Sequence, residues 1–436
     1  MTARDQTTSR LDAPTMRERV RARRRKIWPY LLALGPGLLA ASAGNDAGGI
    51  ATYASAGASY GYDLLWAMVI VTIFVGVVQE MSARLGAITG KGFSDLVREN
   101  FSLRMTSLIL LTLFVANFGI IVSEFVGVAA AAELFGVSRY IAVPLAGALV
   151  WFLITRGSYD RVEKIFLFLT LAFFAYIGAA FLARPDWGEV LVKTVRPTLH
   201  LDVAYLQLLI ALIGTTISPY MQLYVQSSVV EKGVQPDEYR YTRVDVFAGT
   251  LFAGIVASFI IIATAATLYP RGITIETAAD AAVALEPIAG SYARILFGLG
   301  LMGASLLAAG VLPLATTYML SEALGFERGV SRTWSEAPIF LGLFTGLVAV
   351  GAVLALFPGL PLIQVLVGVY VLNGLLLPIE LFAILSLINN RELMGDHVNR
   401  GLYNVLAWAI AIIVSLLSLT LIAITVLGWF GVNLGA

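Results

Sequence analysis

The stretch Ala43-Gly44-Asn45-Asp46-Ala47-Gly48-Gly49-Ile50-Ala51-Thr52 sets an Asn–Asp pair and three glycines in the middle of an apolar segment. Each glycine costs roughly 1 kcal/mol in a helix interior, so the group favours an unwound backbone. An aspartate at the centre of a bilayer costs at least about 2.5 kcal/mol, and unwinding frees carbonyl oxygens that need partners. A bound cation satisfies both requirements, and Asp46 can at the same time cap the helix that follows. The stretch therefore predicts a broken membrane helix with a cation at the break.

A second broken segment is predicted at Gly214-Thr215-Thr216-Ile217-Ser218-Pro219-Tyr220-Met221-Gln222. Pro219 has no amide proton, so the carbonyl oxygen of Thr215, four residues earlier, becomes a free acceptor. The side chains of Thr216, Ser218 and Gln222 add neutral oxygens nearby. Taken alone, the segment is also consistent with a simple proline kink whose hydroxyls bond back to the helix. Beside the first broken segment, we interpret it as the other half of one site.

The composition identifies an integral membrane protein. The chain has 436 residues, of which 58% are hydrophobic and only 13% charged, and its mean hydropathy is +0.84. A soluble domain carries about 25% charged residues and a disordered chain is poor in apolar residues, so both classes are excluded. The absence of cysteine excludes thiolate metal sites and disulfides. Only two histidines are present, His200 and His397, which argues against an imidazole-based metal or proton-relay site.

Eleven apolar windows are long enough to cross a bilayer, which needs ~20 residues per helix. They lie at residues 30–58, 64–87, 105–132, 140–156, 162–183, 203–229, 245–269, 292–321, 337–357, 361–389 and 403–430. Lysine and arginine are richest in the loops after even-numbered crossings, with the loop after the fifth as the exception. Because cytoplasmic loops hold the basic residues, we expect a multi-pass protein of the cell membrane with a cytoplasmic N-terminus and an extracellular C-terminus. Residues 1–26 are polar and basic and are expected to form a disordered cytoplasmic tail.

The two broken segments open two sets of five crossings, at residues 27–184 and 203–389, and residues 403–430 add an eleventh helix. Because each set has an odd number of crossings, the second set enters from the opposite side, which gives the inverted repeat of many secondary transporters. In that arrangement the two breaks meet at the midplane. The donors there are a carboxylate, amide and hydroxyl oxygens and carbonyls, which suit Mg²⁺, Ca²⁺ or Mn²⁺ rather than Zn²⁺ or Cu⁺.

At these residues the chain resembles the Nramp family of divalent-metal transporters, along most of the first ten crossings. The similar stretches are Gly35-Pro36-Gly37, Asp46-Ala47-Gly48-Gly49, Gly57-Ala58, Gly61-Tyr62, Leu64-Leu65-Trp66, Ala83-Arg84-Leu85-Gly86, Thr89-Gly90-Lys91, Arg98-Glu99, Tyr159, Val162-Glu163-Lys164 and Asn390-Arg391-Glu392-Leu393-Met394-Gly395. The resemblance implies an all-α integral membrane protein with the LeuT-type fold. In that fold two inverted five-helix repeats, here with one extra helix, have their first and sixth helices broken at the midplane.

The chain departs from the family pattern within the site that the resemblance implies. Ser218 and Tyr220 stand where the family's helix 6 has Met and His, and Gly49 stands where helix 1 has a ligating Asn. Loss of the soft thioether removes discrimination against Mg²⁺ and Ca²⁺, and two shorter side chains widen the site for a partly hydrated Mg²⁺. On helix 3, Glu124 matches the family's Glu, whereas Ile121 replaces its Asp. The pattern resembles the Nramp-related magnesium transporter branch, which is described as uncoupled from protons.

The metal site implied by these motifs combines the two breaks with two further helices. Helix 10 closes over the metal in the family, which brings Asn373 within reach of the ion. Glu124 is either a contact of the hydrated ion or a buried acid held neutral. The predicted metal ligands are Asp46, Asn45, Gly49, Thr215, Thr216, Ser218, Gln222, Glu124 and Asn373.

The resulting prediction is an uncoupled transporter of Mg²⁺, and also of Mn²⁺, that works by alternating access. It is not expected to be an enzyme, because no metalloprotease-like His-Glu-x-x-His motif or clustered base and nucleophile is present. We expect a divalent metal ion as substrate, a surrounding lipid bilayer, no resident cofactor, no nucleic-acid partner and a monomer. Two alternatives stay open: a proton-coupled Mn²⁺/Fe²⁺ importer, and a sodium-coupled organic-solute transporter of the same fold. The charge of Asp46 argues against an anionic substrate.

Overall fold

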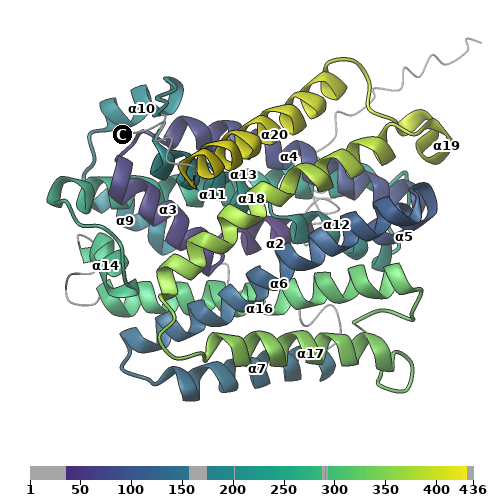
Figure 1. Cartoon of the computed structure of the whole chain (residues 1–436), viewed down its shortest axis with the longest axis horizontal. Coiled ribbons are helices and arrows are strands. Elements are labelled where there is room, and N and C mark those ends of the chain that lie inside the picture. The colour runs from purple at the N-terminus through teal and green to yellow at the C-terminus, as the bar shows by residue number, and fades with distance from the viewer. Residues whose placement is uncertain are drawn as a thin grey trace, which may run out of the picture.

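The computed structural model describes residues 36–156, 174–200, 202–286, 290, 293–330 and 332–429. Within these ranges the chain forms helices and no strand. Long helices run roughly along the horizontal axis of Figure 1, and short helices lie towards its two ends. At the right are α5 (Phe93–Asn100) and α19 (Arg391–Met394), and at the left are α10 (Trp187–Val195) and α14 (Ala278–Ala282). We refer to these as the α5 end and the α10 end.

Twelve helices of the described chain coincide with predicted crossings, and the broken first and sixth crossings contribute two helices each. They are α2 (Pro36–Ala43), α3 (Ala47–Tyr60), α4 (Leu65–Thr89), α6 (Leu103–Leu134), α7 (Arg139–Arg156), α11 (Val203–Thr216), α12 (Pro219–Glu231), α13 (Tyr239–Thr267), α16 (Ala293–Leu324), α17 (Pro338–Ala355), α18 (Leu362–Ile388) and α20 (Gly401–Trp429). Nine stretches of the described chain are long and apolar enough to cross a bilayer. The broken first helix is not among them, because its halves have only 8 and 14 residues.

Two sequence predictions fall largely outside the described residues. The fifth crossing, expected at residues 162–183, is described only as α9 (Phe174–Leu182). The tail predicted at residues 1–26 lies wholly outside the described ranges. The boundaries of the two repeats and the orientation of the ends across the membrane therefore stay predictions.

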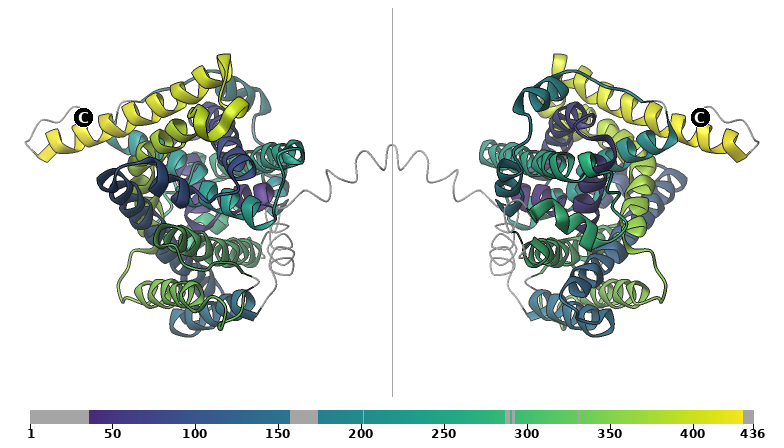
Figure 2. Two further views of the ribbon diagram at one scale, coloured as in Figure 1. Left: turned by 90° about the vertical axis from the view of Figure 1, so that its right-hand side faces the viewer. Right: turned by 90° about the vertical axis from the view of Figure 1, so that its left-hand side faces the viewer.

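The broken sixth helix lies at the centre of the bundle. In the most apolar 18-residue stretch of Val203–Glu231, 94% of the residues are buried, against 28% in those of α7 and α20. Helices α7 and α17 lie side by side at one edge, and α20 runs along another (Figures 1 and 2). Their exposed side chains include large apolar ones such as Leu145, Val353 and Leu416. This pattern is the one expected of a surface that faces lipid tails.

Helix α2 is held against α13 by a buried aspartate and two glycines. Asp245 of α13 accepts hydrogen bonds from the amides of Gly37 (2.6 Å) and Leu38 (3.2 Å), which are free donors in the first turn of α2. A Cβ at Gly37 would lie 2.7 Å from the backbone of Val246, and a Cβ at Gly249 would lie 2.6 Å from that of Leu38. Only glycine lets these two backbones meet, and the contact fixes the first half of the broken helix.

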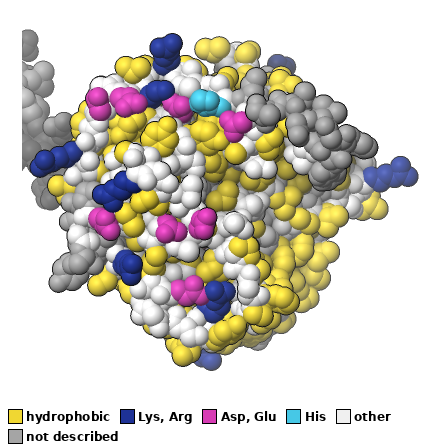
Figure 3. All heavy atoms as spheres, turned by 60° about the vertical axis from the view of Figure 1, so that its left-hand side comes forward, with side chains coloured by type: hydrophobic (Ala, Val, Ile, Leu, Met, Phe, Trp, Pro, Cys, Tyr) yellow, Lys and Arg dark blue, Asp and Glu magenta, His cyan; other side chains and the backbone are white. Residues whose placement is uncertain are grey.

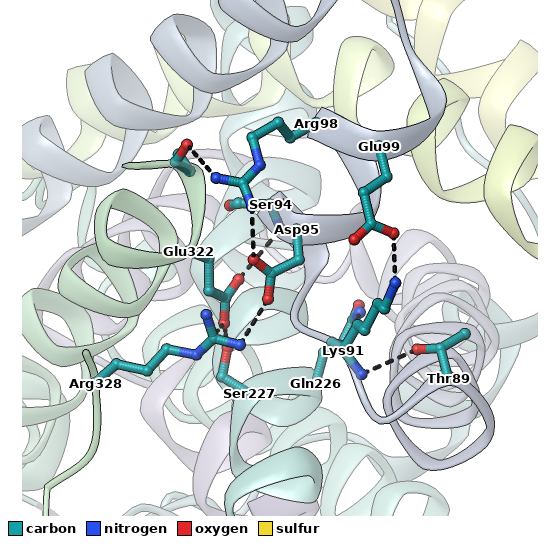
Figure 4. Close-up of polar contacts among 11 residues, drawn as sticks. Thr89, Lys91, Ser94, Asp95, Arg98, Glu99, Gln226, Ser227, Glu322 and Arg328 are labelled. Carbon is teal, nitrogen blue, oxygen red and sulfur yellow. Dashed lines mark hydrogen bonds and ion pairs between the residues drawn. The ribbon is translucent and has the colours of Figure 1, made fainter. Parts of the chain in front are cut away.

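A buried carboxylate joins three helices at the α5 end (Figure 4). Glu322 of α16 accepts hydrogen bonds from the hydroxyl of Ser227 on α12 (2.8 Å) and from the amide of Ser94 in α5 (3.2 Å). The Arg328 guanidinium lies 3.9 Å from the same carboxylate and donates to Asp95 of α5 at 2.6 Å. This Glu322 cluster therefore ties α5 to the second half of the broken sixth helix.

A second polar cluster lies at the α10 end, where charged side chains gather among hydrophobic ones (Figure 3). Asp63, just after α3, lies 2.5 Å from the ammonium of Lys193 and 2.9 Å from Nε2 of His200. Burial raises the pKa of Asp63, but hydrogen bonds and charge from Lys193 and His200 outweigh it and hold that pKa below its usual value. Asp202, the N-cap of α11, accepts a hydrogen bond from the hydroxyl of Tyr60 at 2.7 Å. These contacts join the outer ends of α3 and α11.

Substitution of Gly92, the N-cap residue of α5, tests the Glu322 cluster. A Cβ at Gly92 would lie 2.0 Å from the Glu322 carboxylate, so Gly92→Ala is expected to lower the unfolding free energy by about 1–3 kcal/mol. Thermal unfolding of the purified protein in detergent measures this as a lower midpoint. The matched control is Gly342→Ala in α17, because nothing lies within 4 Å of a Cβ built there. Equal midpoints for the two variants would contradict a stabilising role for the cluster.

Candidate metal-binding site

The predicted break in the first helix is confirmed. Helix α2 ends at Ala43 and α3 begins at Ala47. Asp46 is the N-cap residue of α3, and its Oδ1 accepts a hydrogen bond from the amide of Gly49 at 2.7 Å. The carboxylate satisfies a free amide of the first turn, and the positive end of the α3 dipole stabilises its charge. The capping role of Asp46 is therefore present, and it leaves Oδ2 for other contacts.

The predicted break in the sixth helix is also confirmed, because α11 ends at Thr216 and α12 begins at Pro219. The hydroxyl of Ser218, between them, donates to the carbonyl oxygens of Gly214 (2.7 Å) and Thr215 (3.1 Å). The expectation that the Thr215 carbonyl is a free acceptor is therefore wrong in this arrangement. The Ser218 hydroxyl supplies the proton that the Pro219 nitrogen lacks.

The two breaks face each other across hydroxyl–carbonyl contacts. The Thr215 hydroxyl of α11 donates to the carbonyl oxygen of Gly44 at 3.4 Å. The Tyr220 hydroxyl of α12 donates to the carbonyl oxygen of Ala43 at 2.7 Å. Side chains of the sixth helix thus donate hydrogen bonds to carbonyls that the first break frees. Backbone groups inside a membrane need such partners, because no water reaches them.

Helix α18 packs against the site from a third side. The side-chain nitrogen of Asn373 donates to the carbonyl oxygen of Gly214 at 2.5 Å and to the hydroxyl oxygen of Ser218 at 3.1 Å. Its Oδ1 is buried and has no hydrogen-bond partner among the described residues. Asn373 therefore lies at the break in the sixth helix with one acceptor oxygen unused.

Two tyrosines outside the predicted set of ligands contact Asp46. The hydroxyls of Tyr370 on α18 and Tyr220 on α12 both donate to Oδ2 of Asp46, the latter at 3.4 Å. The sequence pattern identifies Tyr220 only as the occupant of the family's His position and gives no signal for Tyr370. The glycine at position 48 is the one local sign of this contact, because it leaves room for the Tyr370 ring. A Cβ there would lie 2.0 Å from that ring.

Glu124 lies beside Asp46 at the start of α3. Its Oε2 accepts a hydrogen bond from the amide of Ala47 at 3.3 Å, and its Oε1 accepts one from the hydroxyl of Ser123 at 3.4 Å. Both carboxylates are fully buried, and both are bonded to amides of the first turn of α3. The N-terminus of one half-helix therefore holds two acidic groups, which its partial positive charge stabilises.

Three other predicted ligands are not bonded to Asp46. The side-chain nitrogen of Asn45 donates to the carbonyl oxygen of Ala253 on α13 at 3.2 Å. The hydroxyl of Thr216 donates to the backbone of its own helix at 2.7 Å. Both amide atoms of Gln222 are buried without a hydrogen-bond partner in the described part of the chain. Asn45 and Thr216 are thus engaged elsewhere, whereas Gln222 keeps its donors and acceptor free.

The space beside Gly49 is filled in this arrangement, and the expected widening of the site stays a prediction. A Cβ at Gly49 would lie 2.6 Å from the carbonyl oxygen of Gly44 and 2.8 Å from the hydroxyl oxygen of Thr215. Backbone and hydroxyl groups therefore fill the space that the family's Asn would need. The side chains of Asp46 and Asn373 are 0% exposed, so neither contacts bulk solvent in this arrangement.

A sulfur atom lies next to the first break, although the family's Met is replaced. The Met221 side chain occupies the space beside Gly44. A Cβ built on Gly44 would lie 2.1 Å from the methyl carbon of Met221 and 3.5 Å from its Sδ. Sδ accepts a hydrogen bond from the side-chain nitrogen of Gln79 at 3.4 Å. A thioether therefore lies beside the first break, and the predicted set of oxygen ligands stays a prediction. The sequence pattern missed Met221 because it follows Pro219, whereas the family's Met precedes its proline.

Both histidines of the chain lie away from the site. His200 precedes α11 at the α10 end, and His397 ends the short 3₁₀ turn Gly395–His397 beside α19. Ile121 is fully buried, and its Cγ2 would lie 2.8 Å from a Cβ at Gly351 of α17. Within the described ranges, the acidic groups at the site are therefore Asp46 and Glu124, with no imidazole beside them.

Comparison with known proteins places the chain in a family. The model of the Nramp family, described as natural resistance-associated macrophage protein-like, matches residues 37–424. The chain belongs to the Nramp family. It is 28% identical over 404 residues to the divalent metal cation transporter MntH of Deinococcus radiodurans, covering 89% of this chain and 88% of that protein. It is 29% identical over 407 residues to the protein of the same name from Mycobacterium leprae, covering 90% and 92%.

Solved structures show the same fold. The Eremococcus coleocola manganese transporter superposes with a TM-score of 0.72 at 19% identity, covering 98% of this chain and 91% of that one. Mhp1, a nucleobase-cation-symport-1 family transporter, superposes with a TM-score of 0.57 at 15% identity, covering 89% and 92%. These likenesses confirm the LeuT-type fold. As an Nramp-family protein the chain is a multi-pass membrane transporter and not an enzyme; its place in the magnesium branch stays a prediction.

Gly214 is the position at which the contact between α11 and α18 can be tested. A Cβ at Gly214 would lie 2.3 Å from the carbonyl oxygen of Tyr370 and 2.6 Å from the amide of Gly374. Gly214→Ala should therefore push α18 away and lower the unfolding free energy by about 1–3 kcal/mol, measured as a lower thermal midpoint in detergent. Gly368→Ala in α18 is the control, because a Cβ there meets nothing within 4 Å. A midpoint no lower than that of the control would refute the close contact.

Proposed function

We propose that this protein carries divalent metal cations across the cell membrane by alternating access, with Asp46 as the principal charged ligand. The supporting observation is the position of Asp46 between two broken helices whose carbonyl and hydroxyl oxygens gather beside it. A dication neutralises a buried carboxylate and takes such oxygens as ligands. The printed names of the relatives, divalent metal cation transporters, support the same class of substrate.

We propose Mg²⁺ as a substrate alongside Mn²⁺. Ser218 stands at the position of the family's Met, and the unused side-chain oxygen of Asn373 lies beside it. Oxygen donors favour hard cations such as Mg²⁺, and Glu124 adds a second carboxylate at the start of α3. Because Mg²⁺ releases its waters reluctantly, we expect these neutral groups to contact the ion partly through water in the open site.

We propose that transport is not driven by protons. Ile121 replaces an acidic residue, and both histidines lie at the ends of the bundle rather than at the breaks. The membrane potential alone favours entry of a dication, by roughly 2.3 kcal/mol per charge per 100 mV.

In the predicted orientation, the α10 end faces the outside and the α5 end faces the cytoplasm, so the ion enters between the outer half-helices α3 and α11.

Vesicle uptake tests this function directly. Proteoliposomes with a negative interior, no pH gradient and an internal Mg²⁺-sensitive dye should take up Mg²⁺, and Asp46→Ala should reduce the rate at least about tenfold because the main charged ligand is lost. Asp396→Asn is the control, since this carboxylate lies at the exposed α5 end in an ion pair with Arg400. If Mg²⁺ uptake is undetectable while Mn²⁺ uptake acidifies the vesicle lumen, the proposal fails.

A proton-coupled importer of Mn²⁺ is the second candidate, and two observations favour it. The Met221 thioether lies beside Gly44 at the first break, and thioethers favour softer ions such as Mn²⁺ over Mg²⁺. The solved structure with a TM-score of 0.72 is described as a manganese transporter. The sodium-coupled organic-solute alternative has no comparable support, because the likeness to Mhp1, at 15% identity, concerns the fold alone.

Replacement of Met221 distinguishes the two candidates. Met221→Leu keeps the side-chain volume and removes the sulfur, so the Mg²⁺ transporter should keep its Mn²⁺-to-Mg²⁺ preference within about twofold. A thioether that selects Mn²⁺ should instead lose about tenfold in that preference, a difference of about 1.4 kcal/mol. Competition between the two ions in the vesicle assay measures the ratio. Met319→Leu, at a buried methionine of α16, controls for the loss of any buried thioether.

A further inference from the structure

Both carboxylate oxygens of Asp46 are bonded by groups of the chain itself. Oδ1 accepts the amide of Gly49 at 2.7 Å, and Oδ2 accepts the hydroxyls of Tyr220 (3.4 Å) and Tyr370. Both tyrosine side chains are fully buried. A buried carboxylate without donors is strongly unfavourable. These three donors therefore make the closed arrangement compatible with an ionised Asp46.

Tyr370 reaches Asp46 from α18 and not from either broken helix. Its ring lies on the first turn of α3, where a Cβ at Gly48 would stand 2.0 Å from ring carbon Cε2. One turn further along α18, Asn373 donates to the carbonyl oxygen of Gly214 at 2.5 Å. Movement of α18 away from α3 and α11 therefore withdraws the Tyr370 hydroxyl from Asp46 as it opens the site.

A hydroxyl and a cation compete for Oδ2 of Asp46. A carboxylate oxygen has two lone pairs, and those of Oδ2 accept the hydroxyls of Tyr370 and, at 3.4 Å, of Tyr220. A cation that approaches Oδ2 from the side of α18 must displace the Tyr370 hydroxyl, and when the cation leaves, the hydroxyl can return. Tyr220 is the weaker donor of the two, because its hydroxyl also donates to the carbonyl oxygen of Ala43 at 2.7 Å.

We propose that Tyr370 is a positioning residue for the return step of the transport cycle. Its hydroxyl replaces the cation at Asp46, so that the unloaded carrier closes and turns back to the other side. The inference rests on the proposed uncoupled function, because an uncoupled carrier must return unloaded after each net transfer. Exchange of one cation for another does not use that step. Loss of the hydroxyl should therefore slow net transport and spare exchange.

Tyr370→Phe tests the proposal because it keeps the ring on Gly48 and removes only the hydroxyl. Uptake of ⁵⁴Mn²⁺ is measured at a fixed membrane potential and without a pH gradient, into vesicles with no internal divalent cation and into vesicles that hold unlabelled Mn²⁺. We expect net uptake to fall at least about tenfold while exchange stays within about twofold of wild type. The control is Tyr205→Phe, which loses a hydroxyl that donates to the carbonyl oxygen of Thr198 at the α10 end.

Calorimetric titration of the purified proteins with Mn²⁺ gives a second readout. Removal of a competing donor should leave the Kd of Tyr370→Phe unchanged or lower it. A higher Kd would identify the hydroxyl oxygen as a metal ligand and overturn the proposal. An equal loss of net uptake and exchange, or no loss of either, would also overturn it while the proposed function stands. If wild type shows no net metal uptake without a pH gradient, the proposed function fails and the inference fails with it.

Discussion

A carboxylate placed at a gap in a buried helix is the constraint on which this structure depends. The gap exposes carbonyl oxygens and amides where no water can reach them, so every one needs a partner from the protein or from a ligand. The first turn of α3 meets the need on one side by binding both Asp46 and Glu124. The sixth helix meets it on the other by turning Thr215 and Tyr220 towards the carbonyls of Gly44 and Ala43.

Three properties of a metal carrier depend on different residues here: the choice of ion, the coupling to protons and the return without cargo. Choice of ion depends on the atoms around Asp46, where oxygens predominate but the Met221 thioether lies close by. Energy coupling depends on groups that exchange protons, and Ile121 is packed against α17 where the family carries an acid. In the proposed cycle, turnover without cargo depends on α18, which carries Tyr370 to the carboxylate.

The crossings that the structure describes and both breaks were predictable because their signals are local. Long apolar windows mark the helices, while the glycines around Asp46 and the ring of Pro219 mark the places where backbone bonds fail. The contacts that finish the site were not predictable, since Tyr370 lies 324 residues from Asp46 along the chain. The Ser218 hydroxyl replaces a missing amide proton only because of its side-chain rotamer. Patterns of residue type do not contain that information.

Asp46 contributes both a helix-capping hydrogen bond and a negative charge, and a substitution can remove the charge while keeping the cap. Asparagine caps helices about as well as aspartate, and its side-chain oxygen can still accept the Gly49 amide. Its nitrogen would then face Tyr220 and Tyr370, whose hydroxyl oxygens can accept a hydrogen bond as well as donate one. Asparagine at this position would keep the helix cap and remove the negative charge, whereas alanine would remove both the cap and the charge. The difference between the two isolates what charge alone contributes to holding a metal inside a membrane.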